Sequence, residues 1–366
     1  MTPGPERLSL ALVTPPDQRA TYGLALARAF GDLGIDCRPH DDGDPAMFEA
    51  DGIILAGYLP RLCLTKALLR RPGPRPPVLA WAYEPLVPAD IAPWAKRLAL
   101  MLAPASEGRK GNLWLRLTRP GFIPIALFGL GHWGARSTPK ELQFAFGHSI
   151  WLRGALEEGL VDRAAVSTVQ KGHIVAAWGH PWLFAPLSAE LSPDPPRATA
   201  VPRDLDVLFL GRLGKPWRRT PLFSIVRQLR RAGLTVRVVS QGLRGAAREE
   251  VLGCTRLILH MTRFPWDTAW LRFYHAANHG IAVASEPLSV PDPLRPGIDY
   301  LQAAPADLPR AILTLLADET ARAAMAATCA ARIAAEMTFA DGVRRMADAI
   351  VTLRPSVRIK EAAHAG

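Results

Sequence analysis

Short apolar runs alternate with amphipathic segments along the first 190 residues of the chain. Continuous apolar runs suit the strands of a buried parallel sheet, whereas apolar positions three or four residues apart predict helices. We expect strands at residues 7–13, 35–38, 52–56, 78–83 and 168–175, and helices at 22–33 and 149–158. This alternation predicts a doubly wound parallel sheet with helices on both faces.

The second half of the chain repeats the pattern with cleaner boundaries. We expect strands at residues 206–210, 234–240, 257–261 and 281–284, and helices at 221–232, 246–253, 269–279 and 308–317. Residues 319–353 have an almost continuous helical pattern and are rich in alanine. We expect this terminal helix to cross back onto the first domain, because a face of small side chains allows close packing.

A stretch rich in proline separates the two halves. Residues 187–204 show little periodicity and are expected to link two domains. The predicted fold class is therefore α/β, with two doubly wound Rossmann-like domains, a cleft between them and a C-terminal crossing helix. The expected units are residues 1–190, residues 204–335, and residues 336–366 with the terminal helix and tail.

Composition adds a bias toward anionic partners. The 366 residues include 44 lysines and arginines against 33 aspartates and glutamates, a formal net charge of +11. This balance favours nucleotides, nucleic acid or acidic lipid headgroups, although an arginine-rich composition explains it equally well. The four cysteines show neither a CxxC pair nor a metal-ligand spacing. Because no signal peptide is evident and no apolar run reaches the roughly 20 residues of a transmembrane helix, we expect a cytoplasmic protein.

One apolar run, residues 121–136, leaves two interpretations open. It follows a basic stretch that includes Arg109, Lys110, Arg116 and Arg119. A core strand with a glycine turn is the simpler interpretation. The alternative is a segment that dips into an anionic membrane, so that residues 94–136 hold the protein at the inner membrane face.

A basic loop after the first strand of the second half suggests the chemistry. The strand DVLFLG ends at Gly211 and runs into RLGKPWRR, which contains Arg212, Lys215, Arg218 and Arg219. In an open parallel sheet, ligands bind outside the carboxyl ends of the strands, where helix N-termini present N–H groups. Arginine suits bidentate phosphate contacts and lysine acts as a point charge, so the loop suits a diphosphate. The alternative is a basic turn exposed to solvent.

Further motifs follow this loop in a fixed order. The strand LILHMT at residues 257–262 precedes LRFYHAANHG at 271–280 and ASEPLSVPDPLRPGIDYL at 284–301. With these motifs, residues 204–350 resemble the carboxyl domain of GT-B glycosyltransferases. The closest likeness is to the bacterial set related to the spore-maturation protein CgeB, which itself looks like glycosyltransferase family 4. Over the first 190 residues the likeness is one of architecture alone.

The resemblance implies that the second domain binds a nucleotide diphosphate sugar and that the first domain holds the acceptor. The donor-binding residues that it implies are Gly211, Arg212, Lys215, Arg219, His260, Arg272, His275, Gly280 and Glu286. Family 4 enzymes carry two glutamates separated by seven residues, and the matching positions here hold Asp267 and His275. Asp267 keeps a carboxylate, whereas His275 can bond a ribose hydroxyl but cannot accept bidentately.

Three of these residues also have simpler explanations. Arg272 falls in the first turn of a helix, where a cation is unfavourable unless an anion neutralises it. That anion could be a ligand, or it could be the carboxylate of Asp267 or Glu286. Glu286 could accept from sugar hydroxyls or pair with Arg295 instead. Gly280 is expected to end its helix in a left-handed cap.

The acceptor side offers a less specific signal. Glu84 stands among aromatic residues at the end of a predicted strand and is the candidate general base, although a structural carboxylate explains it equally well. Asp267 is the second candidate catalytic residue. Weaker candidates are His132, His148, His173 and His180. His275 and His279 lie four residues apart, but no third ligand follows at a familiar spacing, so no metal is expected.

The sequence thus predicts a glycosyltransferase that moves a sugar from a nucleotide diphosphate sugar to an unidentified acceptor. No metal or other cofactor is expected, because fixed cations and helix N–H groups can stabilise the departing diphosphate. One alternative is a nucleotide-sugar epimerase of the same fold. The other is a non-catalytic basic protein that binds polyanions or a membrane surface, with no specific nucleic acid partner.

Overall fold

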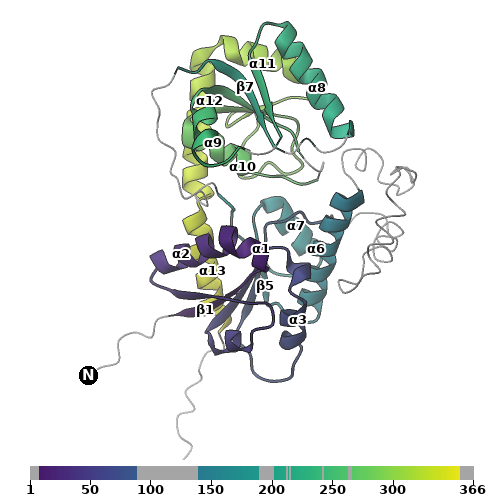
Figure 1. Ribbon diagram of the computed structural model, residues 1–366, viewed down its shortest axis with the longest axis vertical. Coiled ribbons are helices and arrows are strands. Elements are labelled where there is room, and N and C mark those ends of the chain that lie inside the picture. The colour runs from purple at the N-terminus through teal and green to yellow at the C-terminus, as the bar shows by residue number, and fades with distance from the viewer. Residues whose placement is uncertain are drawn as a thin grey trace, which may run out of the picture.

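Two parallel sheets, one in each half of the chain, organise the molecule (Figure 1). The computed structural model describes residues 8–88, 139–188, 202–211, 213, 216–240, 243–262 and 266–354. The first sheet and its helices form one domain, and the second sheet forms the other, with the C-terminal helices running alongside both. This arrangement confirms the predicted fold class.

The first sheet is entirely parallel, in the strand order β2-β1-β3-β4-β5-β6. Its strands are β1 (Ser9–Val13), β2 (Asp36–His40), β3 (Gly52–Ala56), β4 (Val78–Ala82), β5 (Arg163–Val166) and β6 (Trp182–Phe184). Every residue of the two central strands β3 and β4 is buried. Such unbroken burial explains their continuous apolar sequences, because helices cover both faces of the sheet.

Helices of the first domain divide between the two faces of its sheet. One face packs against α3 (Cys63–Leu69), α6 (Pro139–Glu157) and α7 (Val169–Ala177). The other packs against α2 (Leu24–Asp32) and, from the far end of the chain, α13 (Phe339–Leu353). Shorter helical turns connect the strands: α1 (Pro16–Gln18), η1 (Arg19–Gly23), η2 (Pro45–Glu49) and η3 (Leu59–Arg61).

The second sheet has the parallel order β11-β10-β9-β7-β8. Its strands are β7 (Leu205–Leu210), β8 (Val236–Val239), β9 (Thr255–His260), β10 (Ala282–Ser285) and β11 (Leu301–Gln302). One face packs against α8 (Pro216–Arg231) and α11 (Leu308–Ala317). The other packs against α9 (Gly245–Gly253), α10 (Leu271–His279) and α12 (Glu319–Glu336).

The structure differs from the sequence prediction at residues 168–175 and in the terminal helix. Residues 168–175, expected as a strand, belong to helix α7, because the Thr168 hydroxyl accepts the backbone N–H of Lys171 (3.3 Å) and caps the helix. The strand of this region is β5, a few residues earlier. The terminal helix divides into α12 and α13, because Thr338 caps a new helix by accepting from the N–H of Asp341 (3.1 Å).

Helix α13 closes the core of the first domain, as the yellow helix beside α2 in Figure 1 shows. Phe339 lies beside Trp81 of β4, with 6.0 Å between ring centroids. Ile350 is fully buried against Gly52 at the start of β3. Helix α13 therefore belongs structurally to the first domain.

The contact between Gly52 and α13 leaves no room for a side chain. A Cβ atom at Gly52 would lie 2.5 Å from Cγ2 of Ile350. We expect Gly52→Ala to lower the free energy of unfolding by about 1–3 kcal/mol, because an overpacked core must shift. Chemical denaturation measures the loss, and Gly31→Ala is the control, since a Cβ there meets nothing within 4 Å. A Gly52→Ala protein as stable as the unaltered one, or a cost of Gly52→Ala that is unchanged in an Ile350→Ala background, would contradict this packing.

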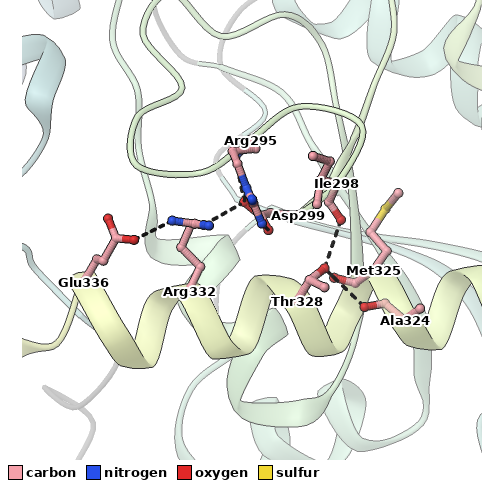
Figure 2. Close-up of polar contacts among 8 residues, drawn as sticks. All are labelled: Arg295, Ile298, Asp299, Ala324, Met325, Thr328, Arg332 and Glu336. Atoms are coloured by element: carbon pink, nitrogen blue, oxygen red, sulfur yellow. Dashed lines mark hydrogen bonds and ion pairs between the residues drawn. The ribbon is translucent and has the colours of Figure 1, made fainter.

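A buried carboxylate fixes α12 to the loop that follows β10 (Figure 2). Asp299 is fully buried and accepts from the backbone N–H of Arg295 (2.8 Å) and from its guanidinium (3.1 Å to each oxygen). Arg332 of α12 brings its Nε atom within 3.1 Å of the same carboxylate. One turn earlier, the Thr328 hydroxyl donates to the carbonyl oxygen of Ile298 (2.9 Å). These contacts attach α12 to the second domain.

Candidate functional site

The carboxyl edges of the two sheets face each other. The Trp266 indole, in the loop after β9, donates to the carbonyl oxygen of Leu86, in the loop after β4 (3.0 Å). In both sheets the strand order reverses beside the first strand, between β1 and β3 and between β7 and β9. Ligands of open α/β sheets bind at this point of reversal, outside the carboxyl ends of the strands. In the second sheet, this rule places a candidate ligand site at the ends of β7 and β9.

Arg272 spans the ends of β7 and β9. Its Nε atom donates to the carbonyl oxygen of Leu210, the last residue of β7. Its Nη1 atom donates to the carbonyl oxygen of Met261 (3.2 Å) and lies 3.1 Å from Nδ1 of His260, the last residue of β9. The guanidinium carbon also lies 5.1 Å from the centroid of the Phe209 ring. A cation is thus held in one orientation at the point where a ligand of this fold would bind.

Gly211 permits this approach. The residue has φ of 152°, and a Cβ atom there would collide with the guanidinium of Arg272. Only glycine allows the backbone after β7 to pass so close to the arginine. The structure therefore brings together three of the predicted donor-site residues, Gly211, His260 and Arg272. The contact between Gly211 and Arg272 explains why the strand must end in glycine.

Glu286 fixes the neighbouring loop. This carboxylate follows β10, is 2% exposed, and accepts from both the backbone N–H and the hydroxyl of Thr262 (2.8 Å each). Arg295, its alternative partner in the sequence analysis, pairs with Asp299. Glu286 thus joins the ends of β9 and β10 at the edge where Arg272 lies. Its position suits contact with a ligand at that edge.

A buried ion pair crosses between the domains. Lys171 of α7 donates to the carbonyl oxygen of Tyr83 (3.0 Å) and to the Ser167 hydroxyl (2.9 Å). Its Nζ atom lies 3.7 Å from Oδ1 of Asp267, and the two side chains are 3% and 7% exposed. Sequence reasoning missed Lys171, because its segment was expected to be a strand. The signal that identifies it is Thr168, which can cap a helix that directs Lys171 to the carboxyl edge.

Glu84 lies beside several tyrosines at the same edge of the first sheet. Burial raises the pKa of Tyr22 and of Tyr83, and the Glu84 charge raises both further. The charge of Arg244, from the second domain, opposes the rise at Tyr22. Glu84 therefore lies where the two domains meet, which agrees with an acceptor-side position. Its role as general base stays a prediction.

Two of the histidines predicted as candidate site residues are buried and neutral. His148 of α6 is fully buried beside Tyr58, with ring centroids 6.0 Å apart, and burial together with the Lys171 charge lowers its pKa to about 3. His275 of α10 is also buried, and burial with the charges of Arg248, His279 and Arg272 lowers its pKa to about 3. A neutral imidazole at position 275 can offer one donor and one acceptor to a ligand.

Gly280 requires a correction. It ends α10 in the left-handed conformation (φ 60°, ψ 42°), so the predicted cap is confirmed. Its carbonyl oxygen accepts from Arg203 (2.7 Å), which precedes β7. That contact lies at the amino edge of the sheet, opposite the end of β7 where Arg272 sits. Gly280 is therefore a structural residue and does not belong to the donor site.

Some predicted residues are not located. Arg212, Lys215 and His132 lie outside the described residues, as does the apolar run at 121–136. Arg219 is placed only through the backbone of α8. Among the residues that are described, no three His, Cys, Asp or Glu side chains are arranged to hold a metal ion. None of the described helices is long and apolar enough to cross a lipid bilayer.

Comparisons with known proteins identify the fold. No protein-family profile and no curated sequence match the chain. Its structure is similar to HepE of Anabaena, solved with UDP-glucose: the TM-score is 0.54 at 11% identity, over 95% of this chain and 100% of that one. It is also similar to a UDP-forming α,α-trehalose-phosphate synthase from Burkholderia xenovorans, with a TM-score of 0.53 at 7% identity, over 96% of this chain and 100% of the synthase chain. The similarity to TarM has a TM-score of 0.50 at 9% identity and covers 82% of this chain. The chain spans about half the length of TarM (54%).

The two doubly wound domains and these neighbours define the GT-B fold. In open α/β sheets, ligands bind outside the carboxyl ends of the strands. The contacts of Arg272, Gly211, Glu286 and the Lys171–Asp267 pair all lie at these edges.

Proposed function

We propose that the protein is a glycosyltransferase that moves a sugar from a nucleotide diphosphate sugar to an acceptor. The observation that carries this proposal is the position of Arg272, held across the ends of β7 and β9 beside Gly211. A preorganised cation at this point stabilises the negative charge that develops on the departing diphosphate. Because the arginine is already fixed by the sheet, little of its conformational entropy is lost on binding.

Other residues take roles around this cation. Arg212, Lys215 and Arg219 of the basic loop would add charge at the diphosphate, while Glu286 and His275 would bond hydroxyl groups of the donor. Asp267 would face the donor sugar, and Glu84 would act as general base on the acceptor if the reaction inverts. The motif order around Arg272 favours the branch of the fold related to CgeB.

The proposed reaction needs no metal ion. Arginine and lysine side chains supply the positive charge that a divalent cation would otherwise place on the diphosphate. Retention of full activity in EDTA is the expected result. Loss of activity in EDTA that returns with added magnesium would refute metal independence and leave the transfer reaction in place.

Ligand binding tests the proposal directly. We expect UDP or GDP to raise the melting temperature of the full chain, since a ligand at 100 times its Kd adds about 2.7 kcal/mol of stability. Uridine and guanosine are the controls, because they lack the diphosphate. UDP-glucose is the first donor to test, because HepE was solved with it. Release of UDP and free or transferred glucose would show turnover.

The two alternative functions give different results. Binding to heparin that collapses between low and moderate salt, without a response to any nucleoside diphosphate, would replace the transferase by a polyanion-binding protein. Inversion at a carbon of the sugar while the nucleotide stays attached, seen by NMR, would indicate an epimerase. Absence of any nucleoside diphosphate binding would overturn the proposed transfer.

A further inference from the structure

His260 contacts the guanidinium of Arg272 from the last position of β9. The distance from Nδ1 of the imidazole to Nη1 of the arginine is 3.1 Å. The histidine is fully buried, and its ring packs at 5.2 Å, centroid to centroid, against Phe273 of α10. A buried histidine and a half-buried arginine thus meet at the edge of the sheet that faces the first domain.

The chemistry of the two groups determines which one donates. A guanidinium has only N–H donors and is always charged. Nδ1 of His260 must therefore present a lone pair to Arg272, so the imidazole is neutral and carries its proton on Nε2. A neutral histidine accepts one hydrogen bond through Nδ1, and here that bond goes to the arginine.

Sheet pairing and a neighbouring carboxylate fix the backbone around His260. In the sheet, His260 is paired with Ser285 of β10. Two residues later, Thr262 donates twice to Glu286 (2.8 Å each). An acceptor mounted on a central strand keeps its position better than one on a free loop. The imidazole is therefore a rigid support for whatever it holds.

Arg272 needs such a support because its place in α10 is unfavourable for a cation. The helix begins at Leu271, and the preceding Trp270 provides no side-chain cap. A positive charge in the first turn is opposed by the helix dipole. The side chain instead reaches back to the carbonyl oxygens of Leu210 and Met261 and to His260. The two backbone acceptors bind Nε and Nη1, and the imidazole contacts Nη1 as well.

We propose that His260 is a positioning residue: through Nδ1 it sets the guanidinium plane of Arg272 in the orientation that a nucleoside diphosphate requires. The inference rests on the proposed function, since it assigns the diphosphate to Arg272. It assigns His260 a role through the arginine, without direct contact to the ligand.

Two variants of His260 separate this role from packing. His260→Asn keeps an acceptor near the position of Nδ1, whereas His260→Leu keeps the apolar bulk and removes the acceptor. Affinities for UDP, GDP, uridine and guanosine are measured by calorimetry on the full chain. We expect His260→Leu to weaken diphosphate binding about tenfold, because one charge-assisted hydrogen bond no longer orients the cation. Nucleoside binding should stay unchanged, and His260→Asn should recover most of the loss.

A ligand-free measurement keeps the inference testable on its own. The guanidinium N–H signals of Arg272 report its ordering in NMR spectra of the labelled protein, with Arg272→Gln used for assignment. We expect these signals to broaden or shift in His260→Leu and to return in His260→Asn. His173→Leu is the matched control: the structure places this candidate histidine in an exposed position of α7, against the ring of Trp182, so the change should alter neither signal nor affinity.

The outcomes separate a failure of the proposed function from a failure of the role proposed for His260. Unaltered protein that binds neither UDP nor GDP refutes the proposed function, while the Arg272 signals still decide whether His260 positions the arginine. Unchanged Arg272 signals in His260→Leu overturn the inference and leave the transferase intact. Equal losses for diphosphates and nucleosides in His260→Leu also overturn it, because they indicate a general disturbance of the site.

Discussion

Replacing Arg272 with glutamine will lower the affinity for UDP or GDP by about 10- to 150-fold, because hydrogen bonds to a charged phosphate group contribute about 1.5–3 kcal/mol. Glutamine keeps polar atoms but has neither the charge nor the fork of the guanidinium. The turnover of a sugar nucleotide should fall further than the affinity, because the cation counters charge that grows as the bond to the sugar breaks. Calorimetry with UDP and GDP, followed by a donor hydrolysis assay, measures both effects.

The control for this variant is Arg310→Gln on α11, whose side chain is 85% exposed. It should leave affinity and turnover unchanged. Because Arg272 also joins β7 to β9, its replacement will lower the melting temperature, so binding is measured well below that temperature. Affinity within threefold of the unaltered protein would exclude Arg272 from the diphosphate site.

Replacing Asp299 with alanine will destabilise the second domain by about 3 kcal/mol, near the lower end of the range for breaking a buried ion pair. The lower end applies because Arg295 is 49% exposed and stays hydrated when it loses its partner. Arg332 loses its partner as well, so the attachment of α12 weakens. Thermal unfolding measures the loss. Asp307→Asn, at an exposed pair with Arg310, is the control and should change stability by less than about 1 kcal/mol.

The contribution of Asp299 depends on pH in a defined direction. Burial alone would raise its pKa, but hydrogen bonds from Arg295 and the charges of Arg295 and Arg332 outweigh burial and hold the pKa below its usual value. The stabilisation is therefore complete above the unfolded-state pKa of about 3.9 and is lost as the pH falls through the lower folded-state pKa. The difference in stability between the unaltered protein and Asp299→Ala should thus shrink below about pH 4. A difference that grows with acid would contradict this assignment.

Much of the fold follows from local sequence signals. The strands β3, β7 and β9 coincide with continuous apolar runs, and the glycine after α10 marks its left-handed end. Both sheets bury their central strands completely or nearly so, and this is why their sequences carry so clear a pattern. Helix α7 was mistaken for a strand because apolar and β-branched residues dominate it, while its start depends on a single capping hydroxyl at Thr168.

Fewer features of the candidate site could be predicted from the sequence. The position of Arg272 in the first turn of a helix correctly indicated an unusual environment. Its partners are backbone carbonyls and His260, which no spacing rule links to it. The pair between Lys171 and Asp267 joins side chains from different domains, so it depends on how the two sheets face each other. Such contacts come from tertiary structure and leave little trace in local patterns.

The position of α13 affects the order in which the two domains can fold during synthesis. The ribosome releases this helix only after the whole second sheet has been synthesised. Phe339, Val343 and Ile350 therefore reach the first sheet last, although that sheet was made first. Domains usually fold as units while the chain emerges, N-terminal part first. Here the second domain can complete its core before α13 covers one apolar face of the first sheet, so the core of the first domain is completed only after the second domain has been synthesised.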